Sequence, residues 1–198
     1  ADPDGSLYLA YVRDLDKGGL PSGTYFRRST DGGASWRTPL ALAVSRYYRL
    51  PSPEETHLDL NVGESGAVYV TWNEPNQEGI LLAYSPDDGA TWGAPRWIGP
   101  PPAGQAAAGG LPRHGRLVPL PGDEPLLLWD VQRPNGTCAL YQATARNLLD
   151  GAGERGVHVL PERLACGQEM HFLTVNDRTT MAVQEPDGSL YTATWNGA

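Results

Sequence analysis

The sequence is poor in the residues on which several classes of protein depend. Its 198 residues include two cysteines, two methionines, two phenylalanines and a single lysine, Lys17. It has no Cys-x-x-Cys pair, and its four histidines show no metal-ligand spacing, so we expect no metal site and no cofactor. Neither a Walker A loop nor a Gly-x-Ser-x-Gly elbow occurs. No apolar run reaches the roughly 18 residues of a membrane span.

Positive charge is also scarce. The formal net charge is −8 at pH 7 and the isoelectric point is about 4.9. An excess of acidic groups repels polyanions, so the composition argues against general binding to nucleic acids or to anionic membrane surfaces. We therefore predict partners of other classes.

The two cysteines, Cys138 and Cys166, fall in consecutive repeat units of the sequence. A disulfide between them and a pair of free thiols both remain open, because no other extracellular marker decides between them. Asn135-Gly136-Thr137 is a glycosylation sequon in a predicted loop, and Asn135 is its acceptor.

Turn-forming residues, in contrast, are abundant: the chain holds 24 glycines and 18 prolines without a collagen period. Roughly fourteen short apolar or alternating runs lie between them and predict strands, and no run predicts a helix. These runs cover residues 6–12, 23–29, 38–44, 57–62, 67–72, 80–85, 94–98, 115–120, 125–131, 138–145, 156–160, 168–175, 179–184 and 189–195. Such spacing is typical of a sandwich, a barrel or a propeller.

One octapeptide occurs twice, as Ser29–Trp36 and as Ser85–Trp92, each time between two predicted strands. Both copies have the pattern Ser-x-Asp-x-Gly-x-Ser/Thr-Trp. The Asp carboxylate can accept backbone N–H groups of its own turn, the Gly can supply a positive φ, and the Trp can bury a large apolar area. The fixed positions are Ser29, Asp31, Gly33, Ser35 and Trp36, and Ser85, Asp87, Gly89, Thr91 and Trp92.

These octapeptides resemble Asp-boxes, also called BNR repeats, of β-propellers such as the sialidases and the sortilin-type receptors. In that family the box is a structural turn between the third and fourth strands of a blade, on the face opposite the active site. The resemblance implies an all-β chain, a β-propeller of four-stranded antiparallel blades. This chain supplies about 3.5–4 blades, which indicates a small or an incomplete propeller.

The pattern predicts one domain over residues 1–198. Its repeat units are residues 1–46, 47–99, 113–161 and 162–198, and residues 100–112 form a loop rich in Pro, Ala and Gly. The segment Glu185–Tyr191 nearly copies Asp2–Tyr8. We therefore expect the first and the last strand to hold equivalent positions in two different blades.

In the family, the loops from second to third strand and from outer to next inner strand gather on one face. Polar residues in these loops are either ligand-binding or simply hydrated. The ligand-binding candidates are Arg13, Asp14, Tyr48, Arg49, Glu74, Arg113, His114 and Asp130.

One tetrapeptide of these loops, Tyr48-Arg49-Leu50-Pro51, is similar to the Phe/Tyr-Arg-Ile-Pro motif of sialidases. In the family the Arg of this motif binds a carboxylate, which would be the role of Arg49. The family places the motif before the first box, and here it follows that box. The catalytic Tyr, the catalytic Glu and the two further arginines are not identified by spacing.

Three functional hypotheses follow. The first is a non-catalytic, secreted or cell-surface propeller module that binds a protein or a glycan, or builds an assembly. The second is a glycoside hydrolase resembling an exo-sialidase. The third is a segment of a longer propeller chain whose function lies elsewhere. The expected partners are a protein or a glycan, and a partner chain that completes the propeller; we expect no nucleic acid partner and no membrane span.

Overall fold

A computed structural model describes most of the chain. The described residues are 4–13, 19–44, 57–74, 79–99, 110–120, 122–132, 138–151, 158–160, 170–175, 178–184 and 188–196. Within them lie fourteen strands and one short helix. None of the helical residues in these ranges forms a segment long and apolar enough to span a membrane.

The strands form four antiparallel sheets that follow one another along the chain. The first sheet contains β1 (Leu7–Arg13), β2 (Gly23–Ser29) and β3 (Leu40–Val44). The second contains β4 (Leu58–Val62), β5 (Val68–Glu74), β6 (Gly79–Ser85) and β7 (Arg96–Ile98). The third contains β8 (Pro112–Val118), β9 (Leu126–Gln132), β10 (Cys138–Thr144) and β11 (His158–Leu160). The fourth contains β12 (Met170–Val175), β13 (Arg178–Gln184) and β14 (Leu190–Asn196).

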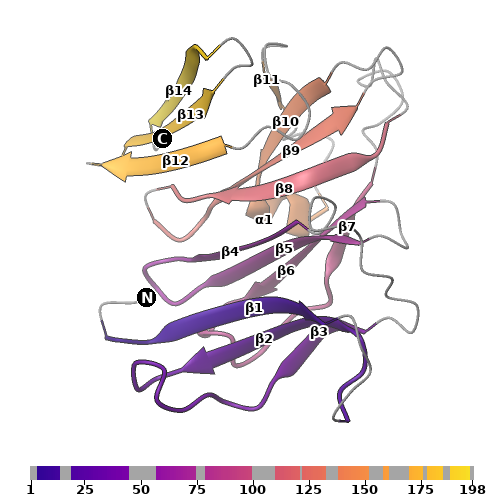
Figure 1. Ribbon diagram of the computed structural model, residues 1–198, viewed down its shortest axis with the longest axis vertical. Coiled ribbons are helices and arrows are strands. Elements are labelled where there is room, and N and C mark those ends of the chain that lie inside the picture. Colours follow the sequence, from indigo (N-terminus) through magenta and orange to yellow (C-terminus); the bar gives the residue numbers. More distant parts are fainter. Residues whose placement is uncertain are drawn as a thin grey trace.

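The four sheets stack in chain order, from the first sheet at the bottom of Figure 1 to the fourth at the top. Each sheet is a meander of three or four strands, and its neighbours cover its faces, as in the blades of a β-propeller. The prediction of an all-β fold of antiparallel propeller blades is confirmed.

Apolar layers between successive sheets hold the stack together. Phe26 of the first sheet packs with Val70 and Trp72 of the second. A second cluster joins the second and third sheets, and a third cluster joins the third and fourth. Strand β6, with the sequence GILLAYS, is buried along almost its whole length because sheets cover both of its faces.

One element was not expected from the sequence. The helix α1 (Ala145–Leu149) follows β10, and the Thr144 hydroxyl caps it by accepting the N–H of Asn147 at 3.3 Å. Leu148 anchors the helix in the layer between the second and third sheets. A five-residue helix is too short to show a helical hydrophobic period, so the prediction of no helix was wrong here.

Candidate functional site

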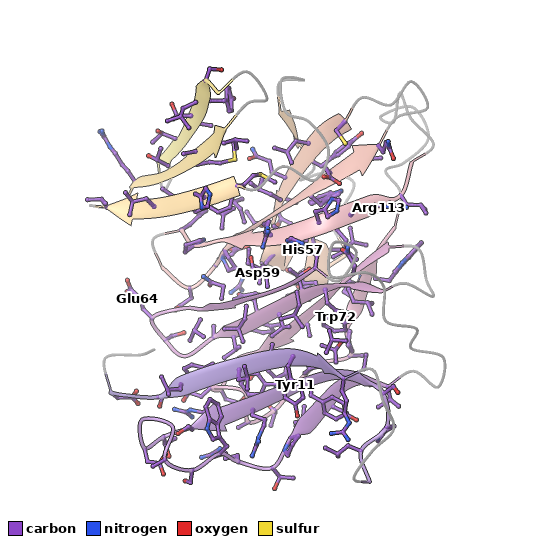
Figure 2. The ribbon with its side chains drawn as sticks, viewed as in Figure 1. Tyr11, His57, Asp59, Glu64, Trp72 and Arg113 are labelled. Atoms are coloured by element: carbon purple, nitrogen blue, oxygen red, sulfur yellow. The ribbon has the colours of Figure 1, made fainter. Side chains whose placement is uncertain are left out.

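A cluster of ionisable side chains lies where β4 and β8 begin and β9 ends. His57 directly precedes β4, His114 lies in β8 and Asp130 lies in β9. Figure 2 shows His57 and Asp59 between β4 and β8, with Arg113 near the beginning of β8. We call His57, Arg113, His114, Arg116 and Asp130 the β4–β8 site.

His114 and Asp130 form the central pair of the β4–β8 site. The His114 Nδ1 atom lies 2.8 Å from Asp130 Oδ2 and 3.0 Å from Oδ1. The Asp130 side chain is 6% exposed, so the surrounding protein shields this pair from water. Such a carboxylate fixes the orientation of the imidazole and stabilises a proton on Nδ1. The pair can therefore present the other ring nitrogen of His114 to a ligand.

A β-bulge places His114 in this position. Arg113 pairs with Asp130 and Arg116 pairs with Leu128, so β8 carries one residue more than β9 over this stretch. His114 itself adopts a positive φ of 52°. Gly115 follows, and a Cβ there would lie 3.0 Å from the Thr71 hydroxyl. Its lack of a side chain lets the bulge approach the second sheet closely.

His57 is the second imidazole of the site. Its ring meets that of His114 edge to face, with centroids 5.6 Å apart. Burial, and then the positive charges of Arg116 and His114, lower the pKa of His57 to about 4. The ring is therefore neutral at pH 7, and its buried Nε2 atom has no hydrogen-bond partner in the described part of the chain. Of the two imidazoles, that of His114 is the one with an established opening to solvent, since its side chain is 22% exposed.

Asp59, next to the site, connects the inner strands of two sheets. Its Oδ2 accepts the N–H of Leu117 at 2.9 Å, and its Oδ1 accepts the N–H of Leu60 at 2.9 Å. Burial raises the pKa of Asp59, although these hydrogen bonds and Arg116 act in the opposite direction. The carboxyl group thus fixes β4 beside β8 and positions His57 relative to His114.

Two tryptophans lie in the second strands of the second and third sheets. Trp72 in β5 is 1% exposed and Trp129 in β9 is 3% exposed. Trp129 also stacks on Tyr141 with centroids 5.8 Å apart. Both indoles are packing residues between or within sheets, and neither presents a face on which a sugar could stack.

The structure brings together three of the predicted ligand-binding residues, Arg113, His114 and Asp130. Arg13 ends β1 in the first sheet, and Glu74 ends β5 with a side chain that is not described. Asp14, Tyr48 and Arg49 lie outside the described residues, as do Asn135 and Cys166. Cys138 is buried in β10 and is not a free thiol. The pairing of Cys138 with Cys166 stays a prediction.

Sequence reasoning missed His57 and Asp59 as members of this region. His57 and His114 each follow a long connection and stand at the start of an inner strand. This shared position in consecutive units was the signal available in the sequence. Metal-ligand spacing does not reveal this signal, because the two residues are far apart in the chain.

The octapeptide turns lie at the opposite ends of the strands. Val68 pairs with Ser85 at one end of the β5–β6 hairpin, and Glu74 pairs with Gly79 at the other. Leu58, which follows His57, pairs with Trp72 near the second of these ends. The β4–β8 site and the two turns therefore lie at opposite ends of the strands.

Comparisons with known proteins support the fold and leave the function open. No family model and no curated protein matches the sequence. A crystal structure of a protein of unknown function from Dyadobacter fermentans is similar with a TM-score of 0.52 and 18% identity, over 98% of this chain. An exo-β-1,3-galactanase from Clostridium thermocellum gives a TM-score of 0.47 and 14% identity, over 99% of this chain. The chain spans 58% and 46% of these two proteins, respectively.

Proposed function

We propose that this chain is a non-catalytic β-propeller module that binds an acidic glycan at the β4–β8 site. The observation that carries the proposal is the buried His114–Asp130 pair beside His57, whose Nε2 atom lacks a partner among the described residues. A buried polar atom without a partner is costly in a folded protein, so a ligand whose binding rearranges the site and gives this atom a partner would recover that cost.

The charges around the pair favour an anionic group on the ligand. Arg113 is exposed and Arg116 is half-buried, and both come from the bulged part of β8. Guanidinium groups bind carboxylates in a bidentate manner, and they stand out here against a net charge of −8. A uronic acid or another sugar acid fits this combination of cations with the neutral imidazole of His57.

The hydrogen bonds of the two carboxyl groups in this region, those of Asp130 and Asp59, support binding without hydrolysis. Hydrolysis of a glycosidic bond commonly requires two carboxyl groups that face the scissile bond. Both oxygens of Asp130 lie within 3.0 Å of His114 Nδ1, and both oxygens of Asp59 accept backbone N–H groups. Each group already has a positioning role in the protein.

A secreted or cell-surface location is part of the proposal. The disulfide-bonded state of Cys138 supports it, because structural disulfides persist in oxidising compartments. Glycans are also abundant outside the cell, where such a module would meet them.

Calorimetric titration with an oligouronide and with its neutral reduced counterpart tests the proposal. We expect binding of the acidic oligosaccharide only, and a loss of about tenfold in affinity for Arg113→Gln and for His57→Leu. Arg178→Gln, in the fourth sheet, is the matched control and should leave the affinity unchanged. Equal binding of both sugars would overturn the acidic preference. No binding of either would overturn the glycan proposal, and cleavage of the ligand would replace it with the glycosidase alternative.

A further inference from the structure

The first sheet can be aligned with the second through the two octapeptide turns. Ser29 ends β2 and Ser85 ends β6, and each begins the same turn. Leu7 pairs with Ser29 in the first sheet, as Val68 pairs with Ser85 in the second. Strand β1 is therefore the counterpart of β5, and β2 is the counterpart of β6.

The two counterparts differ in their neighbours. Strand β5 lies between β6 and β4, whereas β1 is the terminal strand of its sheet within the described chain. The position on the side of β1 away from β2 thus corresponds to the position that β4 occupies beside β5. Leu9, the counterpart of Val70, is 42% exposed, whereas Val70 is 0% exposed. The edge of a sheet with unused backbone groups is a template for a further strand.

The turn that precedes β1 is of a kind that joins two antiparallel strands. Gly66 has a φ of 86° two residues before β5, and Gly188 has a φ of 85° two residues before β14. In both cases an antiparallel partner precedes the turn, since Val62 pairs with Val68 and Gln184 pairs with Leu190. Gly5 has a φ of 83° two residues before β1.

Asp4 fixes the conformation of this first turn. Its Oδ1 accepts the N–H of Ser6 at 2.8 Å, and its Oδ2 accepts the Ser6 hydroxyl at 3.2 Å. Ser6 is 1% exposed, so the turn is built into the folded protein.

We propose that the outer edge of β1 accepts an extended strand that enters through the Asp4–Gly5 turn and belongs to the same polypeptide. The strand runs antiparallel to β1 and completes the first sheet as β4 completes the second. Its chemistry follows from β4, in which Leu58, Leu60 and Val62 pack in the apolar layer and alternate with Asp59 and Asn61. Backbone hydrogen bonds supply the affinity and the alternate apolar side chains supply the register.

A strand graft on the full chain tests this proposal. Residues 57–62 (His-Leu-Asp-Leu-Asn-Val) replace Ala1, so that the grafted Val directly precedes Asp2, as Val62 directly precedes Gly63. We expect the melting temperature to rise by at least about 4 °C and the β1 amides to gain protection from hydrogen exchange.

The matched control carries one extra Ser between the grafted Val and Asp2. A one-residue slip moves every side chain of the grafted strand to the other face, so this variant should show no such gain. Equal melting temperatures of the two variants, or no new protection in β1, would overturn the proposal.

Sedimentation of the ungrafted chain tests the alternative that a second copy of the chain occupies the edge of β1. We expect no association that protects β1 as the concentration rises. A dimer that protects the β1 amides and dissociates in Leu9→Glu would show that a second copy fills the edge, and would overturn the assignment to the same polypeptide.

Discussion

The two octapeptide turns differ little in their internal geometry. Ser35 donates its N–H to Asp31 Oδ1 at 2.8 Å, and Thr91 donates its N–H to Asp87 Oδ1 at 2.8 Å. In each copy the first Ser hydroxyl accepts the N–H of the Gly that both copies share, at 2.9 Å. The motif therefore specifies its own hydrogen bonds, whatever surrounds it.

Their surroundings are different. In the second copy Asp88 accepts the Tyr8 hydroxyl at 3.0 Å and pairs with Arg28 at 3.2 Å, both from the first sheet. Gly32 stands at the position of Asp88 in the first copy. Trp92 packs edge to face on Phe26 of the first sheet at 4.9 Å, and this contact belongs to the layer between the two sheets.

The first copy makes its contacts within its own sheet. Trp36 lies under the guanidinium of Arg27, 5.9 Å from it, and Arg27 Nε donates to the carbonyl of Arg37 at 2.9 Å. The comparison teaches that the octapeptide encodes a turn and that the adjoining sheet decides how much this turn stabilises the fold. Matched substitutions in the two copies separate these contributions.

The largest difference is expected for the glycines that both copies share, Gly33 and Gly89. A Cβ at Gly89 would clash with the ring of Phe26, whereas a Cβ at Gly33 would lie 3.1 Å from the flexible Leu7 Cδ1. We expect Gly89→Ala to destabilise the protein by about 3 kcal/mol and Gly33→Ala by about 1 kcal/mol, since both also force alanine into a positive φ. Urea denaturation of the two variants measures this difference.

Gly93→Ala serves as the control, because a Cβ there would meet nothing within 4 Å. Equal losses at Gly89 and Gly33 would mean that backbone strain alone decides the cost, and that the Phe26 contact does not contribute.

A smaller effect is expected from exchanging Asp88 and Gly32, the residues that differ at the same position of the two copies. Asp88→Gly removes the contacts to Tyr8 and Arg28, but it also relieves a positive φ of 55°. We expect a net loss of about 1 kcal/mol, because the ion pair is partly exposed. Gly32→Asp adds a carboxylate at a position where nothing lies within 4 Å of the new Cβ, and it should give no gain in stability. A double-mutant cycle of Asp88 with Tyr8→Phe isolates the inter-sheet hydrogen bond.

Much of the fold was predictable because its signals are local. Alternating residues such as those of β5, and turn residues such as Asp31 and Gly33, identify strands and turns without knowledge of their neighbours. The resemblance of the octapeptides to Asp-boxes then predicted that the separate hairpins belong to the blades of a propeller. The helix α1 was missed because one helical turn depends on the Thr144 cap and on the burial of Leu148, which is a tertiary contact.

The candidate site was only partly predictable. Arg113, His114 and Asp130 were proposed as candidates because the sequence places them in polar segments beside strand ends; in the structure they lie in β8 and β9 themselves. The role of His57 depends on the bulge at His114 and on burial between two sheets, and neither is visible in the sequence. The position of Asp59 was also unpredictable from the sequence, because its partner is the backbone N–H of Leu117, 58 positions away in the chain.

The smallest expected effect concerns the carboxylates that the two turns share. Hydrogen bonds from the Ser35 hydroxyl and N–H, and from Ser29, lower the pKa of Asp31 to about 2. The N–H and hydroxyl of Thr91, and then Ser85, lower the pKa of Asp87. The folded state therefore favours the charged forms. The stability that they contribute is complete above the ordinary pKa of 3.8 and is lost as the pH falls from there towards 2.

Asp31→Asn and Asp87→Asn should each be less stable at pH 7 and should lose less stability between pH 4 and pH 2 than the parent chain. We expect the acid-induced drop in melting temperature to shrink by roughly 2 °C in each variant, because both carboxylates are solvent-exposed. Thermal melts at half-unit pH steps measure this change. Since the internal hydrogen bonds are the same in both turns, the two profiles should flatten alike; a larger change at Asp87 would show that its contact with the first sheet reaches the carboxylate itself.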